Sequence, residues 1–251
     1  MGLGLGNSIT SKIYKAVASG AASSYSMSFD GTGDFLSFTE TTFNIEDTGD
    51  ELTIAFWAKR TDNNDEAVIF GNSASASFKR LNFDSDGDTL IIESDQNGQT
   101  ATGPVTADTN WHHYAITMVG QSGGNLCATI IYEDGDAVTT TNNNFGVSDG
   151  KDLTINRIGA DAAVSGTKEF KGLLYQVAIW TDKLEANEVA AIYNSGSPID
   201  IEGNSGDYDS SSELAHLWDF REGSGSTAAD QAGSLNATLN GDAAFSTTTP
   251  S

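Results

Sequence analysis

Apolar and polar residues alternate with a period of two over several short stretches of the chain. In residues 51–59, Leu52, Ile54 and Phe56 occupy every second position, which is typical of a strand with one buried face. The same pattern, bounded by turn residues, predicts strands at Tyr25–Asp30, Asp34–Phe38, Glu51–Lys59, Ala67–Gly71, Lys79–Phe83, Thr89–Glu93, Trp111–Val119, Leu126–Glu133, Ala137–Thr141, Leu153–Gly159, Gly172–Trp180, Glu213–Phe220 and Leu235–Leu239.

Turn signals separate these stretches. Asp-Gly pairs at 30–31, 86–87 and 134–135 stand where neighbouring strands would reverse, and tight hairpin turns need the positive φ that glycine supplies. So many short strands must form two sheets that cover each other's apolar faces. The pattern therefore predicts an all-β, antiparallel two-sheet β-sandwich.

Residues 184–194 break the period of two. Leu184, Val189 and Ile192 lie near helical spacing, and Gly196 follows at a natural helix end, so we predict one short helix packed on the sandwich. The chain then divides into an N-terminal arm at 1–24, a β-domain at 25–196, a linker or long loop at 197–212 and a C-terminal strand pair at 213–251.

The charge of the chain disfavours two classes of partner. Its 251 residues carry a net charge of −23, so direct binding to nucleic acid or to an anionic membrane surface would be opposed by repulsion.

No apolar stretch is long enough to predict a transmembrane helix. Polar residues interrupt the N-terminal segment, so no secretory signal is expected. The single cysteine, Cys127, lies in an apolar run and is expected in the core.

Several short motifs follow one another in a recognisable order. They are Ser28-Phe-Asp-Gly-Thr-Gly-Asp-Phe-Leu36, Leu52–Lys59, Trp111–Thr117, Tyr132–Asp136, Ile158-Gly159, Phe170–Trp180 and Ala191–Gly196. With these motifs, residues 25–196 resemble the laminin-G-like, concanavalin A-like lectin domains. The resemblance implies a jelly-roll fold, and by itself it names no ligand.

The C-terminal tail resembles a part of the same family that is out of its usual place. Residues 217–225, Asp230 and residues 239–241 look like the strand pair that usually precedes the Phe-Asp-Gly strand, but here they follow the domain. Either the tail completes the same sandwich or it serves a neighbouring subunit. This order, with the short Gly-Leu leader, resembles the layout of structural proteins of marine bacteriophages.

A calcium site is implied by a second resemblance. Residues 56–63 look like the pentraxin segment that supplies an adjacent Asp and Asn as calcium ligands, here Asp62 and Asn63. Pentraxins take another acid from the loop after the Ile-Gly strand, where this chain has Asp161, but Ala163 stands where a second acid would be expected. Calcium prefers hard oxygen ligands. Calcium is therefore the one expected cofactor, with ordinary solvated loops as the alternative.

Two other groups of metal-ligand residues fit a site less well. Asp84, Asp86 and Asp88 alternate like the start of an EF-hand loop, but glycine is at the fourth position and no helices flank it, so a hairpin turn is expected. His112 and His113 are neighbours on a predicted strand, so their side chains point to opposite faces and cannot chelate one metal together.

Catalysis is not expected. Some relatives of this fold are β-glucanases with a Glu-x-Asp-x-x-Glu run, whose carboxylates perform the chemistry. The nearest run here begins with Glu93 and Asp95, but Gly98 replaces the second glutamate. No Gly-x-Ser-x-Gly motif or plausible Cys–His pair is present. We therefore predict a non-enzymatic protein and assign no catalytic residue.

A carbohydrate site would need exposed aromatic side chains beside polar loops. The loops hold many Asn and Asp residues, including 142–144, but Trp57, Trp111, Trp180 and Trp218 all lie in strand-like runs, so most are expected in the core.

Two functions follow as hypotheses. The first is a virion structural protein, a capsid decoration or fibre-like appendage on the virion surface, which contacts capsid or other virion proteins through its arm or tail and forms homo-oligomers. The alternative is a calcium-dependent carbohydrate-binding lectin or adhesin for host attachment, with glycans as partners. Glycan binding that depends on calcium would separate the two.

Overall fold

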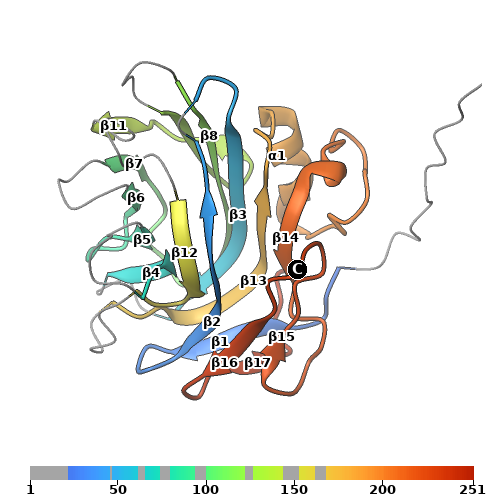
Figure 1. Ribbon diagram of the computed structural model, residues 1–251. Helices are drawn as coiled ribbons and strands as arrows, with labels where there is room; N and C mark the ends of the chain where they lie inside the picture. Colours follow the sequence, from blue (N-terminus) through green and yellow to red (C-terminus); the bar gives the residue numbers. More distant parts are fainter. Residues whose placement is uncertain are drawn as a thin grey trace, which may run out of the picture.

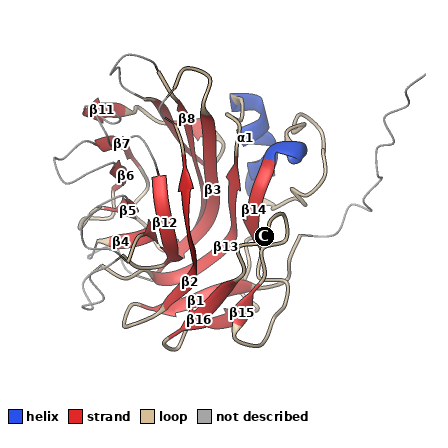
Figure 2. Ribbon diagram, in the orientation of Figure 1, coloured by secondary structure: helices blue, strands red, loops and turns tan. Residues whose placement is uncertain are grey.

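The computed structural model describes residues 22–45, 47–61, 66–73, 80–93, 100–121, 127–143, 153–161 and 168–251. Two antiparallel sheets pack face to face, and one short helix lies against the outside of one of them (Figures 1 and 2). The predicted all-β, two-sheet sandwich with a single short helix is confirmed in these residues.

Sheet A has the strand order β10-β9-β8-β3-β13-β1-β17, and β14 also pairs with β13. Strand β1 pairs with the first half of β13 and β14 with the second half, so these two strands follow one another along the same edge. The strands are β1 (Ser26–Asp30), β3 (Glu51–Arg60), β8 (Trp111–Val119), β9 (Ala128–Glu133), β10 (Asp136–Ala137), β13 (Lys171–Trp180), β14 (Leu214–Trp218) and β17 (Ala244–Ser246).

Sheet B has the strand order β11-β7-β6-β5-β4-β12-β2-β16-β15. Its strands are β2 (Phe35–Phe43), β4 (Ala67–Gly71), β5 (Arg80–Phe83), β6 (Thr89–Glu93), β7 (Thr100–Pro104), β11 (Thr141–Asn143), β12 (Leu153–Ile158), β15 (Thr227–Ala228) and β16 (Ala237–Asn240).

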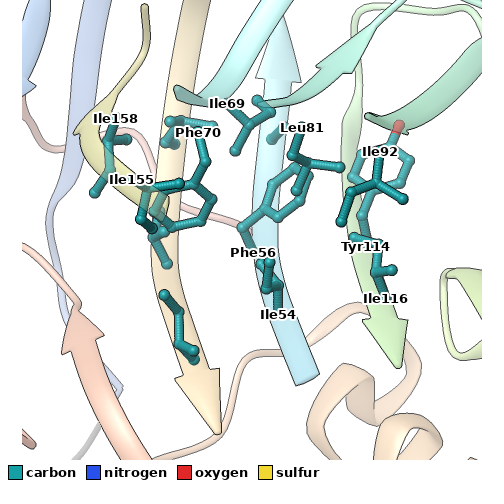
Figure 3. Close-up of a cluster of buried hydrophobic side chains, with 14 of the residues drawn as sticks. Ile54, Phe56, Ile69, Phe70, Leu81, Ile92, Tyr114, Ile116, Ile155 and Ile158 are labelled. Carbon is teal, nitrogen blue, oxygen red and sulfur yellow. The ribbon is translucent and has the colours of Figure 1, made fainter. Parts of the chain in front are cut away.

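The core fills the space between the sheets. Figure 3 shows Ile54 and Phe56 of β3 opposite Phe70 of β4 and Leu81 of β5. The alternation predicted for residues 51–59 is confirmed, because Leu52, Ile54 and Phe56 are buried in this core. Burying a side chain of this size contributes about 1.5–3 kcal/mol, so the core is the main source of stability.

Helix α1 (Ala186–Tyr193) covers the outer face of sheet A, which confirms the helix predicted at 184–194. A capping box between Glu185 and Glu188 starts the helix, and Asn194 ends it with a φ of 46°. Its buried residues Val189 and Ile192 join Ala55, Ala115, Ala178 and Trp180 of sheet A in a second apolar cluster. Single 3-10 turns follow at Asn194–Gly196 and Ser211–Glu213.

Residues 197–212 form a loop that packs on the same outer face. The indole Nε1 of Trp180 donates to the hydroxyl of Tyr208 at 3.0 Å, and that hydroxyl donates to the carbonyl of Ile201 at 2.9 Å. Tyr208 and Ile201 are buried. This loop is therefore part of the folded body.

The C-terminal strands join both sheets of the sandwich formed by this same chain. Strand β14 pairs with β13, β16 pairs with β2, and β17 pairs with β1. Thus Leu239 lies beside Leu36, and Phe245 lies beside Met27. Of the two alternatives for the tail, pairing within the chain is the one observed.

Several strand predictions differ from the structure in detail, and β7, β15 and β17 were not predicted. Residues 137–141 do not form one strand, since β10 ends at Ala137 and β11 begins at Thr141. Strand β7 was missed because its sequence, Thr-Ala-Thr-Gly-Pro, shows no apolar alternation, and Ala101 is its one apolar side chain in the core. Strand β2 extends beyond Phe38 through polar residues, which pair with β12.

Cys127 is buried in the core as predicted. No helix among the described residues is long and apolar enough to cross a membrane.

Candidate functional site

A cavity of about 310 Å³ lies at the end of the sandwich where β2 leads into β3, near the end of β13. Of its lining residues, Thr42, Asn44, Gly49 and Thr181 are exposed, so the cavity opens to solvent. The described lining consists of Thr42, Phe43, Asn44, Gly49, Asp50, Glu51, Leu52 and Thr181.

The turn between β2 and β3 positions Asp50. The Asp47 N–H donates to Asp50 Oδ2 at 2.8 Å, and the Asp50 N–H donates to the Asp47 carbonyl at 3.1 Å. Gly49 has a φ of +102°, a conformation that favours glycine. The Gly120 N–H then donates to the Asp50 carbonyl at 2.8 Å, which fixes the start of β3. The turn therefore presents Asp50 at the cavity through local bonds.

Phe43 supplies the aromatic part of the lining. It is the last residue of β2, and it is largely buried because its ring belongs to the core. His216 of β14 packs edge-on against this ring, with 5.7 Å between ring centroids. The C-terminal segment therefore supports one wall of the cavity.

Two acidic side chains lie close together at the cavity wall, Glu51 in the lining and Asp182 beside it. The carboxyl groups of Glu51 and Asp182 share a hydrogen bond, and this bond, with burial, raises the pKa of Asp182. The Lys183 N–H lies between them, donating to Asp182 Oδ1 at 2.9 Å and to Glu51 Oε2 at 3.3 Å. Thr53 Oγ1 donates to the Asp182 carbonyl at 2.8 Å and holds this segment against β3.

The chemistry of this lining is that of a polar binding pocket. Ionised carboxylates are pure hydrogen-bond acceptors, whereas the Asn44 amide and the hydroxyls of Thr42 and Thr181 both donate and accept. Such groups can bind hydroxyl groups of a ligand in a fixed orientation.

The residues predicted to bind calcium lie elsewhere. Asp161 follows β12 at the end away from the cavity, since Leu153 at the other end of β12 pairs with Phe43. Its carboxylate accepts from Arg80 Nη1 at 3.2 Å, so a guanidinium supplies the positive charge that it faces. Asp62 and Asn63 fall outside the described residues.

Arg80 is surrounded by acids on the outer face of sheet B. Besides Asp161, it pairs with Glu66 at 2.7 Å and with Glu93 at 2.8 Å. Burial opposes the charged form, yet the hydrogen bond and charge of Glu93 leave the pKa of Arg80 raised. Within the described ranges, no group of three or more His, Cys, Asp or Glu side chains is arranged to hold a metal ion.

The glucanase-like run places Glu93 in this ion cluster. Its carboxylate is engaged by Arg80, while Asp95 and Gly98 fall outside the described residues. The predicted hairpin turn at Asp84–Asp88 is confirmed, because it joins β5 to β6 and the Asp84 side chain accepts from the Thr89 N–H.

The two neighbouring histidines have different surroundings. His113 is buried beside Trp57 and Tyr193, and burial lowers its pKa to about 4. His112 bonds to Asp134 at 2.8 Å and to Asp108 at 3.1 Å, and chiefly the bond to Asp134 raises its pKa. The two imidazoles therefore have separate partners, carboxylates for His112 and aromatic rings for His113.

The tryptophans are mostly core residues, as predicted. Trp57, Trp180 and Trp218 are fully buried, whereas Trp111 at the start of β8 is half-buried. None of them lines the cavity in the described part of the chain, where Phe43 is the aromatic residue.

The sequence did not identify the cavity, because its residues come from separate strands. Thr42, Glu51 and Thr181 are ordinary strand-end residues that only the fold brings together. The one local signal was the polar turn at 44–50, which contains Asn44, Gly49 and Asp50.

Comparisons with known proteins agree on one fold. A family model described as the concanavalin A-like lectin/glucanases superfamily matches residues 30–190. A comparison with curated protein sequences gives no match.

Two solved structures are similar to the chain. A putative carbohydrate binding protein from Bacteroides ovatus is 18% identical with a TM-score of 0.60, over 92% of this chain and 61% of that one. The native heptameric SAP-like pentraxin from Limulus polyphemus is 17% identical with a TM-score of 0.50, over 67% of this chain and 81% of that one. The chain spans about three fifths of the Bacteroides ovatus protein, and at these identities the likeness is one of fold.

Proposed function

The chain belongs to the concanavalin A-like lectin/glucanases superfamily, and we propose that it is a non-catalytic carbohydrate-binding domain whose ligand occupies the cavity between β2, β3 and β13. The observation that carries this proposal is the lining of that cavity. One amide, two hydroxyls and two carboxylates meet there beside the largely buried Phe43, and polar groups of these kinds bind the hydroxyl groups of sugars. The volume of about 310 Å³ lies at the small end of ligand pockets, so it suits one or two sugar units.

The arrangement of the carboxylates supports binding rather than hydrolysis. Glycosidases use two carboxyl groups about 5–10 Å apart, on opposite sides of the bond that breaks. Glu51 and Asp182 both accept from the Lys183 N–H, and only Glu51 belongs to the lining, so this pair does not stand on opposite sides of a ligand in the cavity. We expect no sugar release from laminarin-like glucans.

A glycan array tests the proposal. The full chain is expected to bind a subset of the glycans, and Thr181→Trp, which places a bulky ring at the cavity, should weaken that binding at least about tenfold. Thr238→Trp puts the same ring on an exposed position of β16, outside the cavity lining, and should bind like the unmodified protein. Absence of binding to every glycan, or equal binding by both variants, would overturn the proposal.

Calcium dependence stays a prediction from Asp62, Asn63 and Asp161. Two buried oxygen atoms on sheet B, Asn82 Oδ1 and Glu169 Oε1, have no hydrogen-bond partner, and calcium prefers oxygen ligands of this kind. Repeating the array with a chelator tests it, because a calcium-dependent lectin would lose its signals.

A role on a virus particle also stays a prediction. Neither the family description nor the two structures named above mention a virus, so the comparisons favour carbohydrate binding. Mass spectrometry of purified particles tests the virion hypothesis, and light scattering of the purified chain tests the expected homo-oligomer.

A further inference from the structure

The lining of the cavity carries charge of one sign. Asp50 and Glu51 both belong to it, and Asp182 lies beside Glu51, because the Lys183 N–H donates to both of these carboxyl groups. Asp47 adds a further acid in the same turn, bonded through its backbone to Asp50. Among the described lining residues there is no lysine, arginine or histidine.

Two basic side chains lie close to the lining but are not part of it. The Lys183 ammonium lies 2.7 Å from Glu185 Oε1 at the start of α1, and the hydrogen bond with Glu185 is the main reason for its raised pKa, with a smaller contribution from the charge of Glu51. His216 packs against Phe43, and its Nδ1 is bonded to the buried Asp230 at 2.7 Å. Both basic groups therefore have carboxylate partners of their own within the protein.

These charges restrict the kind of sugar that fits. A carboxylate accepts hydrogen bonds and cannot donate them, so Asp50 and Glu51 need a ligand that brings donors. Neutral sugars bring hydroxyl groups, and a hydroxyl bonded to a carboxylate makes a strong, charge-assisted bond. A sugar acid brings a further negative charge, which the Asp50 and Glu51 carboxylates repel at the short distances of a binding pocket.

We infer that the cavity selects neutral hexose residues and rejects sugar acids such as hexuronates, with Asp50 and the Glu51–Asp182 pair as the residues that set this specificity. The inference rests on the proposed carbohydrate binding at the same cavity. The net charge of −23 on the whole chain also repels acidic sugars, at longer range.

Matched ligand pairs test the inference. The methyl glycosides of glucose, galactose and mannose are titrated into the full chain and followed by NMR chemical shifts, each beside the methyl glycoside of its own uronic acid. These pairs differ only in the group at C6. The hexoside that binds is expected to bind at least about tenfold tighter than its uronide.

Charge-removing variants then locate the cause. Asp50→Asn keeps an oxygen that can accept the Asp47 N–H, and it should reduce the preference for the hexoside by at least about threefold. The double variant Glu51→Gln/Asp182→Asn removes both members of the acid pair and keeps their shapes, with the same expected direction. Asp86→Asn is the matched control, because this exposed acid lies in the β5–β6 turn, beside Arg60 at the opposite end of β3.

The outcomes are distinguishable. Failure of every glycoside, neutral or acidic, to bind overturns the proposed function and this inference with it. Binding of a hexoside together with equally tight binding of its uronide overturns the inference alone. An unchanged preference in both cavity variants, or an equal loss in Asp86→Asn, also overturns it, because the selection would then not come from the cavity.

Discussion

His216 Nδ1 lies 2.7 Å from Oδ2 of Asp230, a carboxylate that is almost completely buried. The same carboxylate accepts backbone N–H groups from Leu217 at 2.9 Å, Gly233 at 2.9 Å and Leu235 at 2.8 Å. One side chain therefore holds the 230–235 turn against β14, and β14 in turn supports Phe43 of the cavity through His216.

Replacing Asp230 with alanine should lower the free energy of unfolding by about 3 kcal/mol, because it leaves several buried N–H donors without an acceptor. Urea denaturation followed by circular dichroism measures this loss. Asp86→Asn, a change of an exposed acid, should alter the free energy by less than about 0.5 kcal/mol. A loss below about 1 kcal/mol in Asp230→Ala would contradict the assigned role.

Asp230 should also make the protein sensitive to acid. Burial opposes its ionisation, but the hydrogen bonds from His216 and the backbone hold its pKa at about 2, below the ordinary value of 3.8. A lowered pKa means that the ionised form stabilises the fold above pH 4, and that about 2 kcal/mol is lost as the pH falls from about 4 to about 2.

The difference between the unmodified protein and Asp230→Asn measures this effect. It should be largest near pH 5 and shrink towards pH 2, where the carboxyl is almost fully protonated in the unfolded state and about half protonated in the folded state. A constant difference over this range would show that the side chain acts through shape alone.

His112 should have the opposite dependence on pH. Its bond to Asp134 is the main cause of its raised pKa, so the protonated form stabilises the fold. This stabilisation is complete below the ordinary pKa of 6.5 and is lost as the pH rises through the higher pKa of the folded state. Melting temperatures of the unmodified protein and of His112→Gln should therefore differ more at pH 6 than at pH 9. Equal differences at both values would count against an ionic role of His112.

Tyr208→Phe should destabilise the packed loop at 197–212. The change leaves the buried indole N–H of Trp180 without its acceptor and the Ile201 carbonyl without its donor, so we expect a loss of about 2 kcal/mol. Denaturation in urea measures it. Tyr193→Phe is the control, because Tyr193 is only half-buried at the end of α1. Equal effects of the two changes would mean that the Trp180–Tyr208 bond contributes little.

The fold was largely predictable because its signals are local. The alternation of Leu52, Ile54 and Phe56 and the Asp-Gly hairpin turns at 86–87 and 134–135 depend only on neighbours in sequence, and they were confirmed. The Asp-Gly turn at 30–31 instead leads from β1 in sheet A to β2 in sheet B. The partners of the C-terminal strands depend on which sheet edges are open, which no local pattern encodes. For that reason the sequence left two alternatives for the tail.

The candidate site was much less predictable. Asn44, Glu51 and Thr181 meet only because β2, β3 and β13 end at the same place. Asp161 was predicted to be a calcium ligand, but in the described residues its carboxylate pairs with Arg80, which lies 81 residues earlier in the chain. A search for acidic loops could not foresee a guanidinium at that position.

The pairing of β1 with β17 also determines when folding can finish. The bond from Ser26 Oγ to the Thr248 carbonyl joins residues 222 positions apart, so β1 emerges from the ribosome long before its outer neighbour has been synthesised. Contacts of such long sequence separation form slowly. Until β14, β16 and β17 arrive, the edges of β13, β2 and β1 stay open to pairing with other nascent chains, and unpaired edges of this kind promote aggregation. The yield of native protein in a cell should therefore depend on the speed of translation and on chaperones that shield those edges during this interval.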